Sequence, residues 1–181
     1  MDLAGYVFVT GRPEKADEAT RMGFPLERID LDLPEPQSLD SSEVAEVKAR
    51  AAFDRLQRPV LVEDSGLEVS AWGGFPGALV KWLEKSAGLD AIVRMLDPFP
   101  DRRARAVCAI ACFDGTRLVA ARGVTDGSIA PAPRGSAGFG WDPIFVPYGS
   151  EATYAEMAAT EKDRVSHRGR AWRDLADRLG K

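Results

Sequence analysis

The chain has 181 residues, 45% of them hydrophobic and 29% charged, which is the composition of an ordinary globular protein. That length favours a single domain over residues 1–181. The net charge of -4 argues against a nucleic-acid polymer as partner, because such binding depends on clustered cations. No apolar run approaches the roughly 18 residues of a membrane span, and no signal-peptide pattern is present, so no membrane association is expected.

The first part of the chain alternates between predicted strands and helices. Residues 6–9 predict a buried strand, which Gly11 breaks. Pro13 is typical of the first turn of a helix, and Gly23 is expected to end that helix. Residues 26–33 alternate enough to predict a second strand.

The middle of the chain opens with a capped helix. An Asp-led relative of the capping box begins at Asp40 and predicts a helix to about residue 57. Residues 60–62 predict a buried strand that ends at the acidic segment 63–66. Residues 78–96 predict a hydrophobic helix.

A hairpin and a final helix complete the predicted elements. Asp114-Gly115 is a strong hairpin signal between strands predicted at 104–113 and 116–124. The last helix follows Ser166, and one of its faces is apolar: Trp172, Leu175 and Leu179. Alternating strands and helices followed by a hairpin predict the mixed α/β class.

Two cysteines lie in one apolar stretch of the predicted hairpin. Cys108 and Cys112 share one face of the strand if it is extended. This pattern is typical of buried, reduced packing residues rather than of a disulfide or a metal site. A reducing cytoplasm is the compartment that it favours.

Two adjacent acids mark the end of the strand predicted at 60–62. Asp64 lies where α/β sheets place their ligands. Glu63 is expected to point to the opposite face, so the two should not share one ligand. Asp-Ser-Gly is also common turn chemistry, and for this motif alone a polar turn is the favoured interpretation.

Three lysines offer candidate phosphate contacts. The segment from Thr10 to Lys15 joins a strand to a helix start, where backbone amides and a lysine suit phosphate. An ordinary connection with a solvated lysine fits equally well. Lys48 and Lys81 lie among apolar neighbours, so each either extends its ammonium to solvent, the more frequent outcome, or meets an anion.

A glycine-rich aromatic loop and the only histidine suggest a site for a planar ligand. Residues 138–142 offer bare backbone, two aromatic rings and a carboxylate. His167 and Arg168 lie at the positive end of the last helix, where cations are disfavoured. An acceptor-rich heterocycle such as a nucleotide base would compensate, although two solvated side chains are the commoner alternative.

The motifs of nucleophilic catalysis are missing from the sequence. No Gly-x-Ser-x-Gly occurs, and one histidine excludes a zinc site of clustered histidines. A carboxylate-held Mg²⁺ that activates water is the economical scheme that is left.

Together these segments resemble a known family, the inosine triphosphate or non-standard purine NTP pyrophosphatases. The resemblance spans nearly the whole chain, and order and spacing agree at every anchor. The anchors are Thr10-Gly11 with Lys15, Leu33-Pro-Glu35, Val62-Glu-Asp-Ser-Gly-Leu67, Gly73-Gly-Phe-Pro-Gly77, Gly138-Phe-Gly-Trp-Asp-Pro143 and Ser166-His-Arg168.

The resemblance implies both a fold and an activity. The fold is an elongated, two-lobed mixed α/β structure with a long central sheet and a cleft between the lobes, usually in a homodimer. The activity is Mg²⁺-dependent hydrolysis of ITP, dITP and XTP to the monophosphate and pyrophosphate, by attack of water at the α-phosphorus.

The resemblance also implies roles for individual residues. Glu35 and Asp64 match the metal-site acids, and Asp64 with Lys15 forms the expected catalytic set. The phosphate and ribose contacts correspond to Thr10, Gly11, Lys15, Lys48, Ser65, Lys81 and Lys162. The base pocket corresponds to Phe139, Gly140, Trp141, Asp142, His167 and Arg168.

This chain departs from the family pattern at two places. Arg12 stands where asparagine is usual and is expected to contact the substrate, and no tyrosine follows Gly77. Two alternatives to the leading hypothesis are a nucleotide-binding homologue with weakened catalysis and a pyrophosphohydrolase for other modified nucleoside triphosphates.

Overall fold

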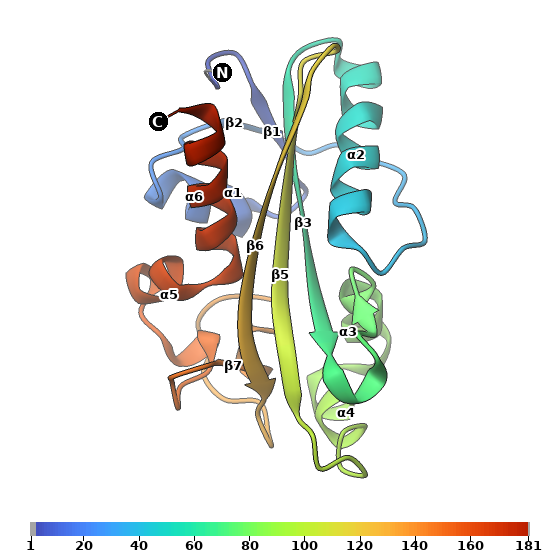
Figure 1. Cartoon of the computed structure of the whole chain (residues 1–181), viewed down its shortest axis with the longest axis vertical. Coiled ribbons are helices and arrows are strands. Elements are labelled where there is room, and N and C mark those ends of the chain that lie inside the picture. The colour runs from blue at the N-terminus through green and yellow to red at the C-terminus, as the bar shows by residue number, and fades with distance from the viewer. Residues whose placement is uncertain (1–2, 181) are drawn as a thin grey trace.

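Two long strands form the centre of the molecule and give it an elongated shape (Figure 1). In the computed structural model, which describes residues 3–180, β5 (Arg103–Phe113) and β6 (Leu118–Ile129) pair antiparallel. β3 (Val60–Val69) pairs with the other edge of β5 over its whole length. These three strands connect the two ends of the molecule.

Shorter strands extend the sheet at both edges. β1 (Val7–Val9) lies parallel between β2 (Glu27–Ile29) and β3, whereas β4 (Pro76–Gly77) and β7 (Phe145–Pro147) pair antiparallel with β3 and β6. The strand order in this seven-stranded mixed sheet is β2-β1-β3-β5-β6-β7, and β4 pairs with β3 outside that order. The predicted mixed α/β class is therefore confirmed.

Helices cover both faces of this sheet. In chain order they are α1 (Pro13–Arg21), α2 (Ser41–Leu56), α3 (Val80–Ala87), α4 (Leu89–Arg94), α5 (Ala159–Val165) and α6 (His167–Leu179), with 3₁₀ turns η1 (Ser70–Trp72), η2 (Asp142–Ile144) and η3 (Tyr154–Glu156). Figure 1 shows α1 and α6 on one side of the long strands, α2 on the other, and α3 and α4 near their far end. None of the helices within residues 3–180 is long and apolar enough to cross a membrane.

The helix ends follow the predicted capping. Asp40 accepts a hydrogen bond from the Ser42 amide at 2.8 Å at the start of α2. Ser166 accepts one from the Gly169 amide at 3.1 Å and thereby caps α6. Residue 167 is therefore fixed as the first residue of that helix.

Alternation along the strands divides the core into layers. Phe8, Cys108 and Cys112 pack under α1 and α6 against Trp172. Neighbouring residues of the same strands, such as Val7, Val60 and Val62, pack against the alanines of α2 on the other face. A third cluster lies below α3 and α4 around Phe145 and Tyr154. The lobe that contains α1, α2 and α6 and the lobe that contains α3 and α4 thus each have an apolar core.

The predicted packing role of the cysteines is confirmed. Both thiols are free and buried in the core under α6. Burial raises the pKa of the Cys112 thiol to about 12, and that of the Cys108 thiol also rises well above its ordinary value, mainly through burial. Neither thiol is therefore a reactive thiolate.

Three boundaries predicted before the hairpin are wrong. The strand expected at 26–33 is only Glu27–Ile29, and the helix expected at 78–96 breaks into α3 and α4 at Gly88, where φ is 76°. The strand expected to end at Val62 continues to Val69, so residues 63–66 are not a turn. The long apolar partner β5 pairs with every residue of this stretch, and tertiary pairing thus overrides the local turn signal.

The hairpin lies where the sequence predicts it. Asp114 Oδ1 accepts hydrogen bonds from the amides of Thr116 and Arg117 at 2.9 and 2.7 Å, and Gly115 adopts a φ of 97°. The second strand begins at Leu118 and runs to Ile129, five residues beyond the predicted end.

Gly123 on β6 offers a test of how closely α6 packs on the sheet. A Cβ at this position would collide with the backbone of α6 at His167 and Ala171. We expect Gly123→Ala to lower the free energy of unfolding by about 3 kcal/mol, because the helix must move away from the strand. Urea denaturation measures the loss. Gly149, whose φ is 83° but whose surroundings are open, is the control. Equal losses for Gly123→Ala and Gly149→Ala would contradict the close packing.

Candidate functional site

A cleft of about 1020 Å³ opens between the two lobes. Its walls come from the β1–α1 connection, residues 30–38, α2, the middle of β3, α3, the loop 139–142 and the start of α6. All but one of the residues expected at the site line it: Thr10, Gly11, Arg12, Lys15, Glu35, Lys48, Asp64, Ser65, Lys81, Phe139, Gly140, Trp141, Asp142, His167 and Arg168. The exception, Lys162, lies behind the wall and binds Asp142.

The adjacent acids Glu63 and Asp64 of β3 point to opposite sides of the strand, as expected from its alternation. Glu63 is completely buried and pairs with Lys15 and with Arg168. Asp64 faces α2, where Lys48 lies 3.6 Å from its Oδ1 atom. The two carboxylates therefore have separate cationic partners and separate roles in the cleft.

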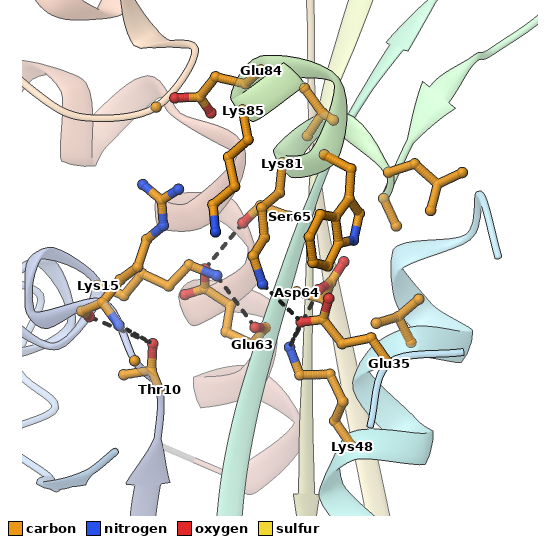
Figure 2. A pocket seen from close by; sticks show the side chains of 18 of the residues that line it. Thr10, Lys15, Glu35, Lys48, Glu63, Asp64, Ser65, Lys81, Glu84 and Lys85 are labelled. Atoms are coloured by element: carbon orange, nitrogen blue, oxygen red, sulfur yellow. Dashed lines mark hydrogen bonds and ion pairs between the residues drawn. The ribbon is translucent and has the colours of Figure 1, made fainter. Parts of the chain in front are cut away.

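Glu35, Lys48 and Asp64 form a compact charged cluster, seen in Figure 2. Lys48 Nζ lies 2.8 Å from Glu35 Oε1, and Lys81 Nζ lies 3.5 Å from the same oxygen. The favoured interpretation that these lysines extend to solvent is wrong for both, because their ammonium groups meet a carboxylate. Lys81 reaches across the cleft from α3, so this cluster joins the two lobes.

Burial and charge oppose one another at these two acids. Burial raises the pKa of the Asp64 carboxyl, although Lys48 and Lys15 act against it. At Glu35 burial acts in the same direction, but the hydrogen bond and charge of Lys48, with the charge of Lys81, lower the pKa below its ordinary value. Burial therefore has the larger effect at Asp64, whereas the lysines together have the larger effect at Glu35.

Glu35 and Asp64 fit the chemistry of a magnesium ion. Asp64 Oδ2 is buried and makes no hydrogen bond of good geometry within residues 3–180. The ammonium of Lys48 between the two acids shows that the pair attracts a cation. The described residues contain no group of three or more His, Cys, Asp or Glu side chains suited to a metal. Mg²⁺ commonly uses one or two protein carboxylates with water and substrate phosphates, so a pair is enough.

A buried chain of ion pairs links α1, β3, α5 and α6. Glu18 Oε2 lies 2.6 Å from Arg168 Nη1, and Glu18 Oε1 lies 2.9 Å from Lys162 Nζ. Arg168 Nε also lies 2.9 Å from Glu63 Oε1, and Lys162 Nζ lies 2.5 Å from Asp142 Oδ2. Buried ions are tolerated only when paired in this way. The chain of charges therefore connects the start of the last helix to the middle of β3.

His167 is buried beneath two aromatic rings rather than solvated. Its ring stacks on Trp141 at 5.1 Å and on Tyr154 at 5.7 Å between centroids. Neither ring nitrogen has a hydrogen-bond partner within residues 3–180. Burial, reinforced by the charge of Arg168, lowers the pKa of His167 well below its ordinary value. The imidazole is thus neutral and offers one donor and one acceptor.

Arg168 is also buried, but its donors are already in use. Its guanidinium binds Glu18 and Glu63 and donates to Ser65 Oγ at 3.2 Å. The alternative of two solvated side chains at the start of α6 is therefore wrong. His167 and Arg168 were both expected to offer free donors to a base. Within residues 3–180, only His167 of the two has polar side-chain atoms without a hydrogen bond, because Arg168 is paired with Glu18 and Glu63.

The loop 138–142 closes on itself around a phenylalanine. The Phe139 amide donates to Asp142 Oδ2 at 2.8 Å, and a Cβ on Gly138 would collide with that carboxylate. Three cations approach the Phe139 ring: Lys162 at 5.0 Å, Arg168 at 5.1 Å and Arg12 at 5.6 Å. These contacts hold the half-buried ring at the wall of the cleft.

The sequence interpretation missed three charged residues of this region. Glu18 and Glu63 are buried partners of the predicted cations, and Lys85 lines the cleft. A signal for Glu18 and Lys85 was present, because Glu18 follows Lys15 by three residues and Lys85 follows Lys81 by four, spacings that place two side chains on one helix face. Lysine is also scarce: of the five lysines that the structure describes, four line the cleft and Lys162 binds its wall.

Comparison with known proteins gives a consistent result. Residues 6–178 match the Ham1 family. The sequence is 42% identical to the dITP/XTP pyrophosphatase of Thermococcus kodakarensis over 95% of both chains. It is 41% identical to the inosine triphosphate pyrophosphatase of Kluyveromyces lactis, over 96% of this chain and 94% of that protein.

Solved structures agree with the fold. The Ham1 protein of Staphylococcus aureus superposes with a TM-score of 0.82 at 28% identity, over 97% of this chain and 98% of that one. The structure of a nucleoside-triphosphatase or dITP/XTP pyrophosphatase from Mycobacterium abscessus gives 0.74 at 33% identity, over 94% and 98% of the two chains.

The buried ion pairs predict how stability depends on pH. Burial raises the pKa of Glu18, but Arg168 and Lys162 outweigh it and lower the pKa from 4.5 to about 2. Because the folded pKa lies below the unfolded one, the contribution is complete above pH 4.5 and is lost as the pH falls towards 2. We expect a loss of about 3 kcal/mol across this window, measured as the free energy of unfolding in urea.

Glu18→Gln should remove that dependence and destabilise the protein at pH 7, because it leaves two buried cations short of a partner. Glu14→Gln, at an exposed position of the same helix, is the matched control and should behave like the wild type. Parallel stability curves for Glu18→Gln and the wild type between pH 4.5 and 2 would refute the assignment.

Proposed function

The chain belongs to the Ham1 family, and on this premise we propose that it is a nucleoside-triphosphate pyrophosphatase, a hydrolase that acts on acid anhydrides. It hydrolyses deaminated purine nucleotides, namely ITP, dITP and XTP, to the monophosphate and pyrophosphate. The observation that carries this conclusion is near-complete alignment, at about 40% identity, with relatives named for these activities. The cleft supports it, because it gathers carboxylates and lysines beside an aromatic pocket.

The reaction asks the protein mainly for positioning and charge neutralisation. Water attacks the α-phosphorus, a P–O bond forms, and the bond to the leaving pyrophosphate breaks. Asp64, whose pKa is raised by burial, accepts the proton of the water at one of its carboxylate oxygens. Lys15, beside Glu63, and Lys48, beside Asp64, neutralise the phosphate charge.

Magnesium is the cofactor that we propose for this site. Glu35 and Asp64 would hold it, on the strength of their adjacent oxygens and the cation already drawn between them. When bound, the ion neutralises phosphate charge and polarises the phosphorus centre. Lys81, which contacts Glu35, orients that acid from the opposite lobe.

We propose that His167 reads the base. Its neutral ring, held against Trp141 and without a partner for either nitrogen, has a donor for the 6-oxo group of hypoxanthine or xanthine. Adenine carries an amino donor at that position and would leave the buried donor unpaired, a mismatch that can reach about 10⁴-fold. Arg168 and Asp142 act behind it by fixing the start of α6 and the loop 138–142.

We also propose that the protein is a homodimer and acts in the cytoplasm. The two free buried thiols support a reducing compartment. The homodimer rests on the resemblance to the family.

The proposed function is tested by the identity of the inorganic product. ITP, XTP, ATP and GTP are supplied with Mg²⁺, and pyrophosphate and orthophosphate are measured separately. We expect pyrophosphate from ITP and XTP at rates at least tens of times those with ATP, and no turnover when EDTA replaces Mg²⁺. Orthophosphate as the product, equal rates on ATP, or tight ITP binding without turnover would each overturn the proposal.

A second test compares the adjacent acids Asp64 and Glu63 of β3. Asp64→Asn should reduce kcat for ITP roughly 10³-fold because it removes the proton acceptor, and circular dichroism and the melting temperature should stay unchanged. Glu63→Gln is the matched neighbouring variant. It removes a carboxylate that pairs with Lys15 and Arg168, so it should lower the melting temperature. Retained turnover in a folded Asp64→Asn protein would remove Asp64 from its role.

A further inference from the structure

Lys85 is a cleft lysine to which neither the sequence nor the family resemblance assigns a role. It lies in the last turn of α3, four residues after Lys81, and the two side chains therefore share one face of the helix. Figure 2 shows Lys81 and Lys85 both pointing from α3 into the cleft, towards the segment of β3 that carries Glu63, Asp64 and Ser65.

The position of the Lys85 ammonium is held by an aromatic ring. Lys81 Nζ and Lys85 Nζ lie 5.1 and 5.5 Å from the centre of the Trp82 ring. Such contacts are worth about 0.5–1 kcal/mol at exposed sites. They favour a defined place for both amines at the mouth of the cleft.

Lys85 differs from the other lysines of the site in its charge balance. Lys15 pairs with Glu63, Lys48 with Glu35 and Asp64, Lys81 with Glu35, and Lys162 with Glu18 and Asp142. Within residues 3–180, Lys85 forms no ion pair with a carboxylate, although it lines the same cleft. Its charge acts on the neighbouring Glu84 carboxyl only at longer range than an ion pair, so the ammonium can still pair directly with an anion from outside the chain.

A purely structural explanation accounts for only part of this arrangement. A lysine in the last turn of α3 interacts favourably with the negative end of the helix. That effect requires a cation near the last turn, but it does not require the side chain to point into the cleft. The Trp82 ring contributes to the direction of Lys85, and this direction places the ammonium where an anion bound in the cleft would meet it (Figure 2).

We propose that Lys85 is a further substrate-binding residue, which contacts the phosphate chain of the nucleotide from the α3 side of the cleft. The proposal rests on the proposed function in taking a nucleoside triphosphate as the ligand. Lys15 and Lys48 meet the phosphates from the β3 side, so the chain of phosphates lies between cations of both lobes. Lys85 is the cation among the cleft lysines that the phosphates need not share with a protein acid.

The test uses inorganic tripolyphosphate, which has no base or ribose. Calorimetry with the wild type and Lys85→Gln should show roughly tenfold weaker binding in the variant, as expected for one charge-assisted hydrogen bond. In ITP hydrolysis the same variant should raise KM by a similar factor and leave kcat within about twofold. Lys85→Arg should keep most of the affinity. Arg94→Gln, which also removes one exposed cation but lies outside the cleft, should match the wild type.

Equal tripolyphosphate affinity in Lys85→Gln and the wild type would overturn the proposal, as would an equal loss in Arg94→Gln. A higher KM for ITP with unchanged tripolyphosphate binding would also overturn it, because the effect would then come from the base or ribose. Binding of tripolyphosphate needs no turnover, so a wild type that binds it but releases no pyrophosphate from ITP would refute the proposed function and leave the role of Lys85 standing.

Discussion

The pleat of one strand organises the whole site. Because neighbouring residues of β3 face opposite ways, Glu63 and Asp64 lie one residue apart and yet meet different cations. Glu63 is enclosed by Lys15 and Arg168, which fixes the start of α6 against the sheet. Asp64 has one oxygen, Oδ2, that makes no hydrogen bond of good geometry within residues 3–180, and it lies beside Lys48, which also pairs with Glu35. One carboxylate thus stabilises the structure, and its neighbour stays available for chemistry.

Many elements of the fold could be predicted from short sequence signals. Pro13, the Asp40 cap, the Asp114-Gly115 turn and Ser166 each predict an element that the structure contains at that position. These signals depend on backbone preferences over a few residues, so they survive without tertiary information. The prediction of a turn at 63–66 is wrong because it too depended on local residues alone. In the structure these residues are extended by pairing with β5, more than 40 residues away in the sequence.

The site was less accessible to local reasoning than the fold. Family resemblance identified the residues that line the cleft, but it did not predict their ion pairs, their protonation or their burial. That Arg168 is occupied by two carboxylates, and that His167 is neutral and stacked, depends on burial among α1, β3 and η3. Glu18 illustrates the limit, because it looks like a solvated helix residue until the last helix brings Arg168 against it.

The contact between Glu18 and Arg168 joins two distant parts of the chain and therefore forms late in synthesis. Glu18 and Arg168 are separated by 150 residues, so the pocket cannot exist until the end of the chain has been synthesised and has docked on its beginning. An incomplete chain on the ribosome would carry Asp64, Glu35 and Lys48 without His167, the residue that we propose to read the base. The acids of the charged cluster and the residue that we propose for base selection are therefore synthesised at different times, and the position of the second depends on α6.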